Sequence, residues 1–343
     1  MDTLSRNFMK GFLITRLALY PLVNNRHFQI PYDWCLSLLS RQSRFNQNSR
    51  PTLQLSGMPS PRNLLIIANL LIALAGCKPS ENQRVEIDAM SFNIRYGLAK
   101  DGENHWDNRH HLVFETIKSH APAIVGLQEA LEFQLQQILE EIPSYASVGI
   151  AREADGTGEY TAILYPTDNF ELLEHDTFWL SDTPEKASSS WGNNLFRICT
   201  WALFRAKGFD KEFYVYNTHF DHRSEGSRES SARFVAEYIA SRERSMAPFL
   251  LLGDLNASED AVPIEILLGQ KGKAQLVDTF REIYPDANDA GTFGAWVGKT
   301  DGEKIDYVFA DSSVDVLDAA IVRDNVNGQY PSDHYPVTAR IRF

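Results

Sequence analysis

The sequence predicts an α/β domain built on packed β-sheets. Strand-like and helix-like segments alternate in the first part of this domain, between Val85 and Ile142. Strand-like segments rich in β-branched and aromatic residues then cluster in the last part, between Ile305 and Phe343. Alternation followed by clustering is typical of a domain in which helices cover β-sheets.

The early elements are assigned from periodicity. Val85–Ile94 reads as a strand, and Ala123–Gln128 reads as a short buried strand. Between and after them, Arg109–His120 and Leu131–Ile142 carry apolar residues at helical spacing, which predicts two helices. Helices and strands therefore take turns along this part of the chain.

The later elements are mostly strands. A third helix is expected over Arg228–Arg242, where Ala232, Val235 and Ile239 fall on one side. The expected strands are Tyr160–Tyr165, Thr200–Ala206, Glu212–Phe220, Phe249–Leu252, Ile305–Ala310, Val316–Val322 and Pro336–Phe343.

Composition excludes several classes of protein. The 343 residues are 43% hydrophobic and 23% charged, which is ordinary for a globular chain and argues against general disorder. Three cysteines are too few for a disulfide scaffold. A net charge of −12 does not suit a protein that coats nucleic acid, although a bound divalent metal can supply positive charge for a phosphate substrate.

The first 57 residues differ from the rest. They contain seven basic and two acidic residues, so this segment has a net positive charge. The net negative charge of the chain comes from the residues that follow it. They show no sustained helical or strand periodicity, and we interpret residues 1–57 as a non-domain leader. An upstream start codon assigned in error and a genuine Arg-rich leader are both open explanations.

Residues 58–76 read as a signal peptide. Met58–Arg62 is a short positive start, and the apolar run from Asn63 to Ala75 has the length of a signal-peptide core. The ending Leu74–Cys77 resembles the lipobox of bacterial lipoproteins, and a buried core helix is the alternative. The resemblance implies cleavage before Cys77, lipidation of Cys77 and anchoring in the bacterial cell envelope.

The lipoprotein resemblance also implies where the anchored protein goes. Lys78 is compatible with sorting to the outer membrane. Residues 77–84 form a polar linker, and the domain covers residues 85–343. The other cysteine after the signal, Cys199, is expected to be a small core residue.

Polar and acidic residues stand at the ends of several expected strands. One such residue after an apolar strand is most often a helix cap or a turn residue, but six of these sites are hard to explain by capping. Strand ends that converge are where α/β folds place their active sites. The six sites are Asn93, Gln128–Glu129, Asn217–His219, Gly253–Asn256, Asp306 and Ser332–His334.

The ordered set resembles the endonuclease/exonuclease/phosphatase superfamily, which has the deoxyribonuclease-I-like fold. The resemblance runs from about Val85 to Phe343 and is similar in detail to a bacterial branch with Thr177–Ser181 and Arg197–Trp201. It implies a four-layer α/β sandwich of two packed mixed β-sheets flanked by helices. It also implies hydrolysis of phosphoester bonds with Mg²⁺ or Mn²⁺.

The resemblance implies a metal site. Glu129 is then the principal carboxylate ligand, and Asn93 completes that side as a carbonyl ligand or through water. Asp333 serves a second metal or orients its neighbours, so one-metal and two-metal mechanisms both stay open. Hard divalent cations prefer oxygen ligands, and one or two carboxylates suffice for them.

The resemblance also implies catalytic roles. His334 is then the catalytic base or acid, and Asp306 bonds to its other ring nitrogen. Asp254 and Asn256 position the attacking water and bind the phosphoryl group. His219 donates a hydrogen bond to a phosphate oxygen as charge builds there.

Three further residues are candidates for substrate contacts. Arg197 suits a second phosphate because its fork matches phosphate oxygens, and a surface salt bridge is the alternative. Tyr160 precedes a strand near the expected cleft. Asp221 extends the His219 motif, and a role in stabilising the loop is the alternative.

Three functions compete at this stage. The first is a metal-dependent phosphoesterase, expected to be a monomer, that acts on a small or lipid-linked phosphate. The second is an exported nuclease that degrades DNA or RNA. The third is a binding module that kept the fold and lost the chemistry, which is disfavoured because every expected catalytic position holds the right type of residue.

Overall fold

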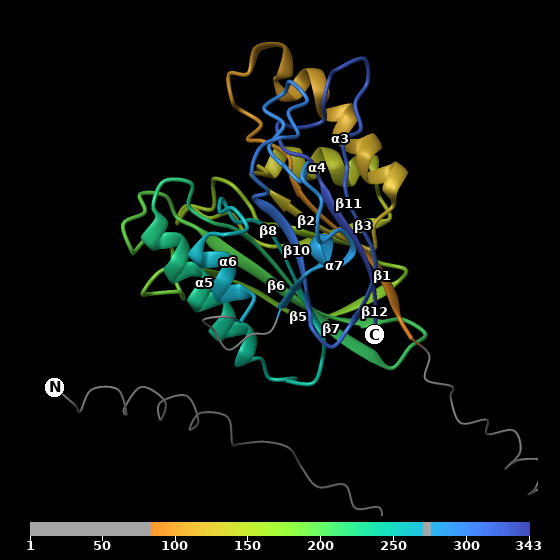
Figure 1. The fold of residues 1–343 in the computed structure, drawn as a ribbon, viewed down its shortest axis with the longest axis vertical. Coiled ribbons are helices and arrows are strands. Elements are labelled where there is room, and N and C mark those ends of the chain that lie inside the picture. The colour runs from red at the N-terminus through yellow and green to blue at the C-terminus, as the bar shows by residue number, and fades with distance from the viewer. Residues whose placement is uncertain (1–83, 270–275) are drawn as a thin grey trace, which may run out of the picture. The chain divides into compact units, whose positions relative to one another are not determined.

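The computed structural model describes residues 84–269 and 276–343, drawn in colour in Figure 1. All of them belong to one compact unit, Lys78–Phe343. The predicted leader, signal peptide, Cys77 and most of the linker lie outside the described residues. Within the described residues, no helix has the length and apolar character needed to cross a membrane.

Two six-stranded mixed sheets form the centre of this unit, in the orders β11-β12-β1-β2-β4-β3 and β5-β6-β7-β8-β10-β9. The β1–β2 and β7–β8 pairs are parallel, and the other pairs are antiparallel. The strands are β1 (Glu86–Asn93), β2 (Ile124–Gln128), β3 (Tyr145–Val148), β4 (Ile163–Pro166), β5 (Phe170–Trp179), β6 (Ile198–Ala206), β7 (Lys211–His219), β8 (Phe249–Asp254), β9 (Leu276–Asp278), β10 (Asp306–Asp311), β11 (Asp315–Ile321) and β12 (Val337–Arg342).

Helices cover the outer faces of both sheets, as Figure 1 shows. One outer core packs α3 and α4 on β1 and β2, and the other packs α5 and α6 on β6 to β8 and β10. The predicted four-layer sandwich is confirmed. The helices are η1 (Gly102–Asn104), α3 (Trp106–His120), α4 (Glu132–Glu141), α5 (Glu225–Ala240), α6 (Val262–Leu267) and α7 (Thr279–Ile283).

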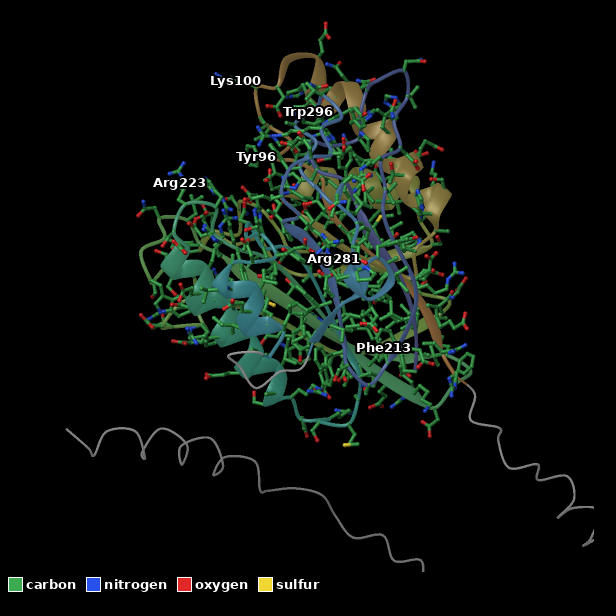
Figure 2. The ribbon with its side chains drawn as sticks, in the orientation of Figure 1. Tyr96, Lys100, Phe213, Arg223, Arg281 and Trp296 are labelled. Atoms are coloured by element: carbon green, nitrogen blue, oxygen red, sulfur yellow. The ribbon has the colours of Figure 1, made fainter. Side chains whose placement is uncertain are left out.

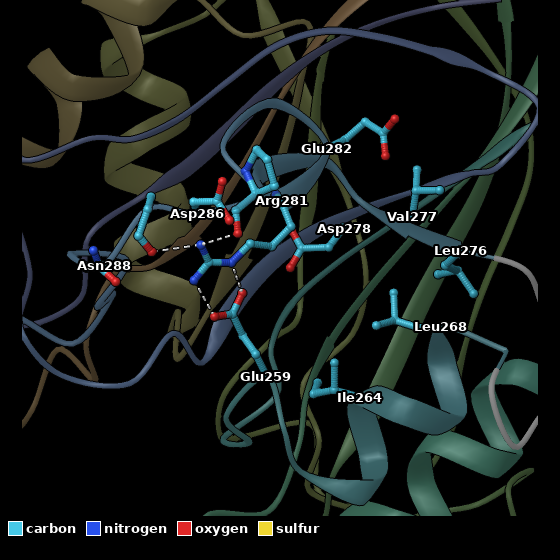
Figure 3. A pocket seen from close by; sticks show the side chains of 12 residues that line it. Glu259, Ile264, Leu268, Leu276, Val277, Asp278, Arg281, Glu282, Asp286 and Asn288 are labelled. Carbon is cyan, nitrogen blue, oxygen red and sulfur yellow. Dashed lines mark hydrogen bonds and ion pairs between the residues drawn. The ribbon is translucent and has the colours of Figure 1, made fainter.

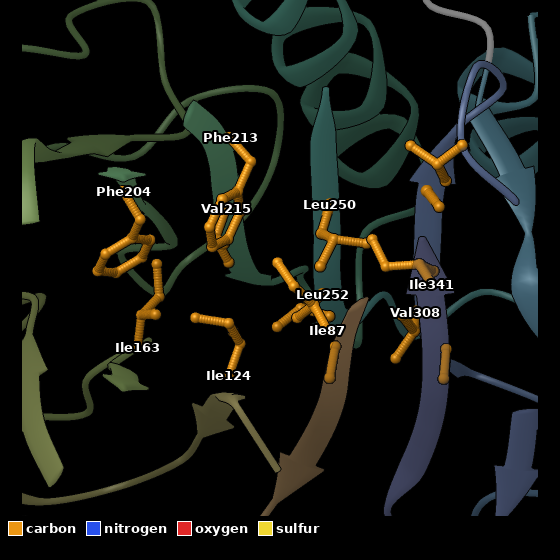
Figure 4. Packing of buried hydrophobic residues seen from close by; sticks show 14 of the residues in the cluster. Ile87, Ile124, Ile163, Phe204, Phe213, Val215, Leu250, Leu252, Val308 and Ile341 are labelled. Carbon is orange, nitrogen blue, oxygen red and sulfur yellow. The ribbon is translucent and has the colours of Figure 1, made fainter. Parts of the chain in front are cut away.

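A third core fills the space between the two sheets. Ile87 and Ile124 from the first sheet face Val215 and Leu252 from the second, as Figure 4 shows. All four side chains are fully buried. Burial of this much apolar surface fixes the distance between the sheets, because protein interiors are close-packed.

One polar side chain crosses this apolar interior. Asn217 of β7 donates from Nδ2 to the carbonyl oxygens of Leu127 and Ala162, at 2.9 and 2.8 Å, and both acceptors belong to the opposite sheet. Its Oδ1 accepts a hydrogen bond of 2.6 Å from Gln128. Gly126 makes room for the crossing, because a Cβ there would lie 2.8 Å from Asn217 Oδ1.

The first and last strands of the domain are neighbours within one sheet. β1 and β12 pair antiparallel, from Glu86 opposite Arg342 to Ser91 opposite Val337. Val85 and Phe343 also exchange two backbone hydrogen bonds, at 2.9 and 3.1 Å. This pairing is internal to the sheet, because β1 lies between β12 and β2.

We predict that Gly126→Ala lowers the free energy of unfolding by about 1–3 kcal/mol, because the added methyl group overpacks the contact with Asn217 and Leu252. Urea titration measures the effect. Gly226→Ala is the control: it lies in the first turn of α5, its nearest neighbour to a new Cβ is 3.9 Å away, and alanine favours a helix there. Equal stability of Gly126→Ala and the wild type would contradict the prediction.

Candidate active site

The predicted site residues gather at one end of the two sheets. Asn93 and Gln128 are the last, paired residues of the parallel strands β1 and β2. His219 and Asp254 are the last, paired residues of the parallel strands β7 and β8. Asp306 begins the antiparallel strand β10 directly opposite Asp254. The two sheets therefore each bring one set of polar side chains to the same end, as expected for strand ends that carry a site.

Asn93 joins the two halves of this cluster. Its Nδ2 donates to Glu129 Oε1 at 3.1 Å and to Asp254 Oδ2 at 2.9 Å. Its Oδ1 accepts from the backbone N–H of Arg95 at 2.9 Å, so the amide nitrogen faces the two carboxylates. The second oxygen of Glu129 accepts from the backbone N–H of Tyr96 at 2.7 Å. Ligation of a metal by Asn93 stays a prediction.

Three residues of the site have a left-handed backbone. Arg95, Glu129 and Asn256 have φ angles of 62°, 60° and 46°. Glu129 comes directly after β2, whereas Arg95 and Asn256 come two residues after the last residues of β1 and β8. This conformation costs a residue other than glycine about 1–3 kcal/mol. Local hydrogen bonds hold it, such as the 2.9 Å bond from the Asn256 N–H to Asp254 Oδ1.

His334 and Asp306 form a buried pair. His334 Nδ1 donates to Asp306 Oδ2 at 2.9 Å, as the sequence predicts. Burial alone lowers the pKa of His334, but the charges of Asp306 and Asp254 and the hydrogen bond to Asp306 outweigh it and raise this pKa well above its usual value. These surroundings favour the protonated ring, and its Nε2 lies 3.8 Å from Asp254 Oδ2.

The pKa of His219 is shifted in the direction opposite to that of His334. The Nε2 atom of His219 lies 3.5 Å from Asp254 Oδ2. Burial, followed by the nearby charges of Arg197 and Arg152, lowers the pKa of His219 well below its usual value. The pKa values of two imidazoles next to one carboxylate are thus shifted in opposite directions, a division of environments typical of acid–base chemistry.

Asp254 lies at the centre of the cluster and is fully buried. Burial and the charge of Asp306 raise its pKa to about 7, against the opposing effects of His334 and of the hydrogen bonds from Asn93 and Asn256. A carboxylate whose pKa lies near neutrality can accept a proton and release it again.

The donor set fits a hard divalent cation. Asp254, Asp306 and His334 have potential ligand atoms within 4.8 Å of one another. His334 Nδ1 is already bonded to Asp306, so the carboxylate oxygens are the better donors for such a cation. Asp306 Oδ1 is buried without a hydrogen-bond partner among the described residues, so this oxygen remains available as a ligand or acceptor.

Asp333 also belongs to the cluster. Its Oδ2 lies 3.7 Å from Arg95 Nε, and Ser332 ties the segment to β1 through a 2.7 Å bond to the Asn93 carbonyl. Burial raises the pKa of Asp333, with the charge of His334 opposing it. Asp333 therefore adds a further carboxylate to a site that already has too few cations.

Arg197 and Asp221 form the wall behind His219. Arg197 is only 3% exposed, so the alternative of a surface salt bridge is wrong. Its Nη2 bonds to His222 at 3.0 Å, and its Nε lies 3.7 Å from Asp221. Asp221 Oδ1 accepts from the N–H groups of Arg223 and Ser224, at 2.9 and 2.7 Å, which favours the loop-stabilising role.

Sequence reasoning missed a buried arginine. Arg109 is stacked between the rings of Trp106 and Trp296, at 5.3 and 4.9 Å from their centroids. Its Nη1 donates to the carbonyl of Pro331 at 2.6 Å, next to the Ser332–His334 segment. The predicted helix over Arg109–His120 includes this residue but gives no sign of the contact. No local signal reveals it, because the partners are far apart in sequence.

An exposed aromatic residue at the site was also missed. The ring of Phe293 lies 5.1 Å from the ring of His334, edge to face, and Phe293 is 40% exposed. Tyr96, Trp296 and Arg223 lie on loops at the same end of the domain, whereas Phe213 lies toward the other end, as Figure 2 shows. Aromatic side chains on loops therefore lie at the end of the domain that holds the cluster.

A hollow of about 900 Å³ lies beside α7, away from this cluster (Figure 3). Its lining includes four carboxylates and one cation, Arg281. Arg281 makes two bonds to Glu259, at 2.7 and 2.6 Å, and the carboxylate of Asp278 bonds to the buried Lys304 at 2.5 Å. The single cation is therefore already engaged and the lining is acidic, which does not suit a phosphate, so we place the chemistry in the cluster.

The chain belongs to the endonuclease/exonuclease/phosphatase family, whose sequence model matches residues 90–334. Members of this superfamily hydrolyse phosphoester bonds, as nucleases or phosphatases. Among solved structures, the chain is similar to a family protein from Bacteroides vulgatus, with 32% identity, coverage of 75% of this chain and 98% of that chain, and a TM-score of 0.68.

A mannosyl-6-phosphatase from Bacteroides thetaiotaomicron is similar to the same extent. The identity is 29%, the coverage is 75% of this chain and 100% of that chain, and the TM-score is 0.69. An uncharacterised protein of Acanthamoeba polyphaga mimivirus is 29% identical over 163 residues. That match covers 45% of this chain and spans 60% of the length of the viral protein.

We predict that Mn²⁺ or Mg²⁺ stabilises the folded protein. At about 100 times the dissociation constant, a bound ion adds about 2.7 kcal/mol to the free energy of unfolding, and this gain is measurable as a rise in melting temperature. Glu129→Gln should reduce this rise because it removes a carboxylate oxygen. The control is Glu140→Gln on the exposed face of α4. The same metal-induced rise in Glu129→Gln and the wild type would argue against a site at Glu129.

Proposed function

We propose that this chain is a metal-dependent hydrolase of phosphoester bonds, in which water attacks phosphorus with help from the His334–Asp306 pair. The observation that carries the proposal is one buried cluster in which His334 Nδ1 bonds to Asp306 Oδ2 at 2.9 Å, and the Nε2 atoms of His334 and His219 lie 3.8 and 3.5 Å from Asp254 Oδ2. This combination supplies a proton acceptor and two hydrogen-bond donors around one point, as phosphoryl transfer to water requires.

The charge states assign roles to the chain's own residues. Asp254 accepts the proton of the attacking water, and the Asn93 and Asn256 N–H groups hold its two oxygens in place. The surroundings of His334 favour its protonated form, so we assign it the role of a donor to the phosphoryl oxygens rather than that of the base, and Asp306 fixes its orientation.

Two further groups complete the proposed site. His219 donates from Nε2 to the phosphoryl group and stays neutral because of its burial. Glu129 is the proposed holder of Mg²⁺ or Mn²⁺, and Asn93 or Asp333 would complete the set. When bound, the metal supplies the positive charge that offsets the charge on the phosphoryl and leaving oxygens.

We favour a small phosphorylated molecule as the substrate. The similar protein from Bacteroides thetaiotaomicron is a mannosyl-6-phosphatase. The net charge of −12 also disfavours close contact with a long polyanion. An exported nuclease acting on DNA or RNA is the second candidate, because the family also contains nucleases. A catalytically silent module is least favoured, since the charge pattern of the cluster serves no structural need.

We predict that His334→Ala lowers the rate of phosphoester hydrolysis by about 10²–10⁴-fold, because a charged donor is lost. Asp306→Asn added to that variant should cost little more, since Asp306 acts through His334 and coupled residues are non-additive. Single-turnover rates in Mg²⁺ are compared for the wild type, the two single variants and the double variant. Additive losses would show that the two residues act separately.

A substrate panel with Mg²⁺ tests the function itself. It spans plasmid DNA, RNA, sugar phosphates, inositol phosphates and sphingomyelin, each with and without excess chelator. Hydrolysis of a small phosphate that stops in chelator supports the proposal. Preferred cleavage of DNA or RNA that weakens steeply with salt favours the nuclease. Full activity in excess chelator overturns the metal-dependent mechanism.

The working protein is proposed to start at Met58 and to be anchored in the cell envelope by two acyl chains on Cys77. Two chains give stable anchoring where one is marginal. Mass spectrometry of the native protein should find a lipidated N-terminal peptide at Cys77, and Cys77→Ser should leave the membrane fraction. An intact Met1 on a protein absent from membranes would exclude the anchor.

A further inference from the structure

A groove of about 610 Å³ lies beside the catalytic cluster, on the side of Glu129. Tyr96 connects the two, because its backbone N–H donates to Glu129 Oε2 and its side chain lines the groove. Tyr160 connects them as well, since its backbone N–H donates at 2.8 Å to the carbonyl of Ala130, the residue after Glu129. A group attached to a phosphate bound at the cluster can therefore reach the groove.

Hydrogen bonds and close packing hold the loop that forms one wall of the groove. Gln134 of α4 accepts from the N–H groups of Gly97 and Leu131, both at 3.0 Å, and donates to the carbonyl of Arg95 at 3.1 Å. A Cβ at Gly97 would lie 2.5 Å from Gln134 and 2.7 Å from Phe133, so only glycine allows this approach. The loop that carries Tyr96 is thus fixed on α4 before any ligand binds.

Two kinds of side chain line the groove. Tyr96, Leu98, Phe133 and Tyr160 provide aromatic and aliphatic surface, and Leu98 is 60% exposed. Carboxylates provide the polar part, from Glu132, Glu153 and Glu159, against a single cation, Arg152.

Arg152 is already engaged by two of these carboxylates. It bonds to Glu159 at 2.7 Å and lies 3.4 Å from Glu153. The groove therefore keeps a net negative charge and a surplus of hydrogen-bond acceptors. A phosphate backbone is repelled by such a lining, whereas a neutral molecule that donates several hydrogen bonds is attracted.

We propose that this groove binds the neutral, polyhydroxylated part of the substrate, a sugar ring of hexose type whose phosphate lies at the catalytic cluster. Hydroxyl groups donate to the surplus carboxylates, and the apolar face of the ring packs on Tyr160 and Tyr96. The volume lies in the range of small-molecule sites. The inference rests on the proposed phosphoester hydrolysis, and it names the class of leaving group.

The test compares two substrates that differ only in what the groove would hold. With Mg²⁺, Tyr160→Ala should raise KM for mannose 6-phosphate by about three- to tenfold more than KM for methyl phosphate, which has no ring. Leu98→Trp should do the same by filling the groove from an exposed position. Phe209→Ala is the matched control: it is a 37% exposed aromatic on the β6–β7 turn at the other end of the sheets, and it should change neither KM.

Free mannose provides a readout that needs no chemistry. It should inhibit hydrolysis of methyl phosphate competitively in the wild type and more weakly in Leu98→Trp. Equal effects of the groove variants on both substrates, or inhibition by a nucleoside but not by mannose, overturn the inference. If no phosphoester is hydrolysed, the proposed function fails, and saturation-transfer NMR with mannose still decides whether the groove binds a sugar.

Discussion

The side chain of Asn217 leaves β7, crosses the apolar layer and hydrogen-bonds to the opposite sheet at Leu127 and Ala162. Such a buried amide is stable only with all its partners in place, so it permits one alignment of the two sheets. Two residues beyond Asn217 lies His219, and two beyond Leu127 lies Glu129. The polar crossing therefore sets the distance between the two halves of the site, and Gly126 provides the space for it.

Charge organises the site once the sheets are aligned. Glu129, Asp254, Asp306 and Asp333 meet in a region with His334 and Arg95 as nearby cations. Burial and mutual repulsion raise the pKa of Asp254, while the same carboxylates keep His334 protonated. The cluster thus stores unfavourable charge that a bound cation would relieve, and binding of such an ion would then add to the stability of the fold.

Sequence predicted the strand ends well because a polar residue after a buried strand is a local pattern. The same reasoning missed β3, β5 and β9, since β5 carries exposed charged residues at its middle and β9 has three residues. It also missed the contact of Arg109 with Pro331, which unites residues 222 positions apart. Asn217 was recognised as part of a motif, but its role between the sheets depends on a partner sheet that only the folded chain brings near.

The pairing of β1 with β12 bears on how the chain becomes folded. One edge of β1 pairs with β12, the last strand of the chain. This part of the sheet therefore cannot form until β12 has been synthesised. Contacts of such long sequence separation slow folding and leave strand edges exposed in the meantime. Until β12 is made, the edge of β1 that faces it lacks its partner strand, so this edge is open to pairing with the wrong strand for most of the time that the chain is being synthesised.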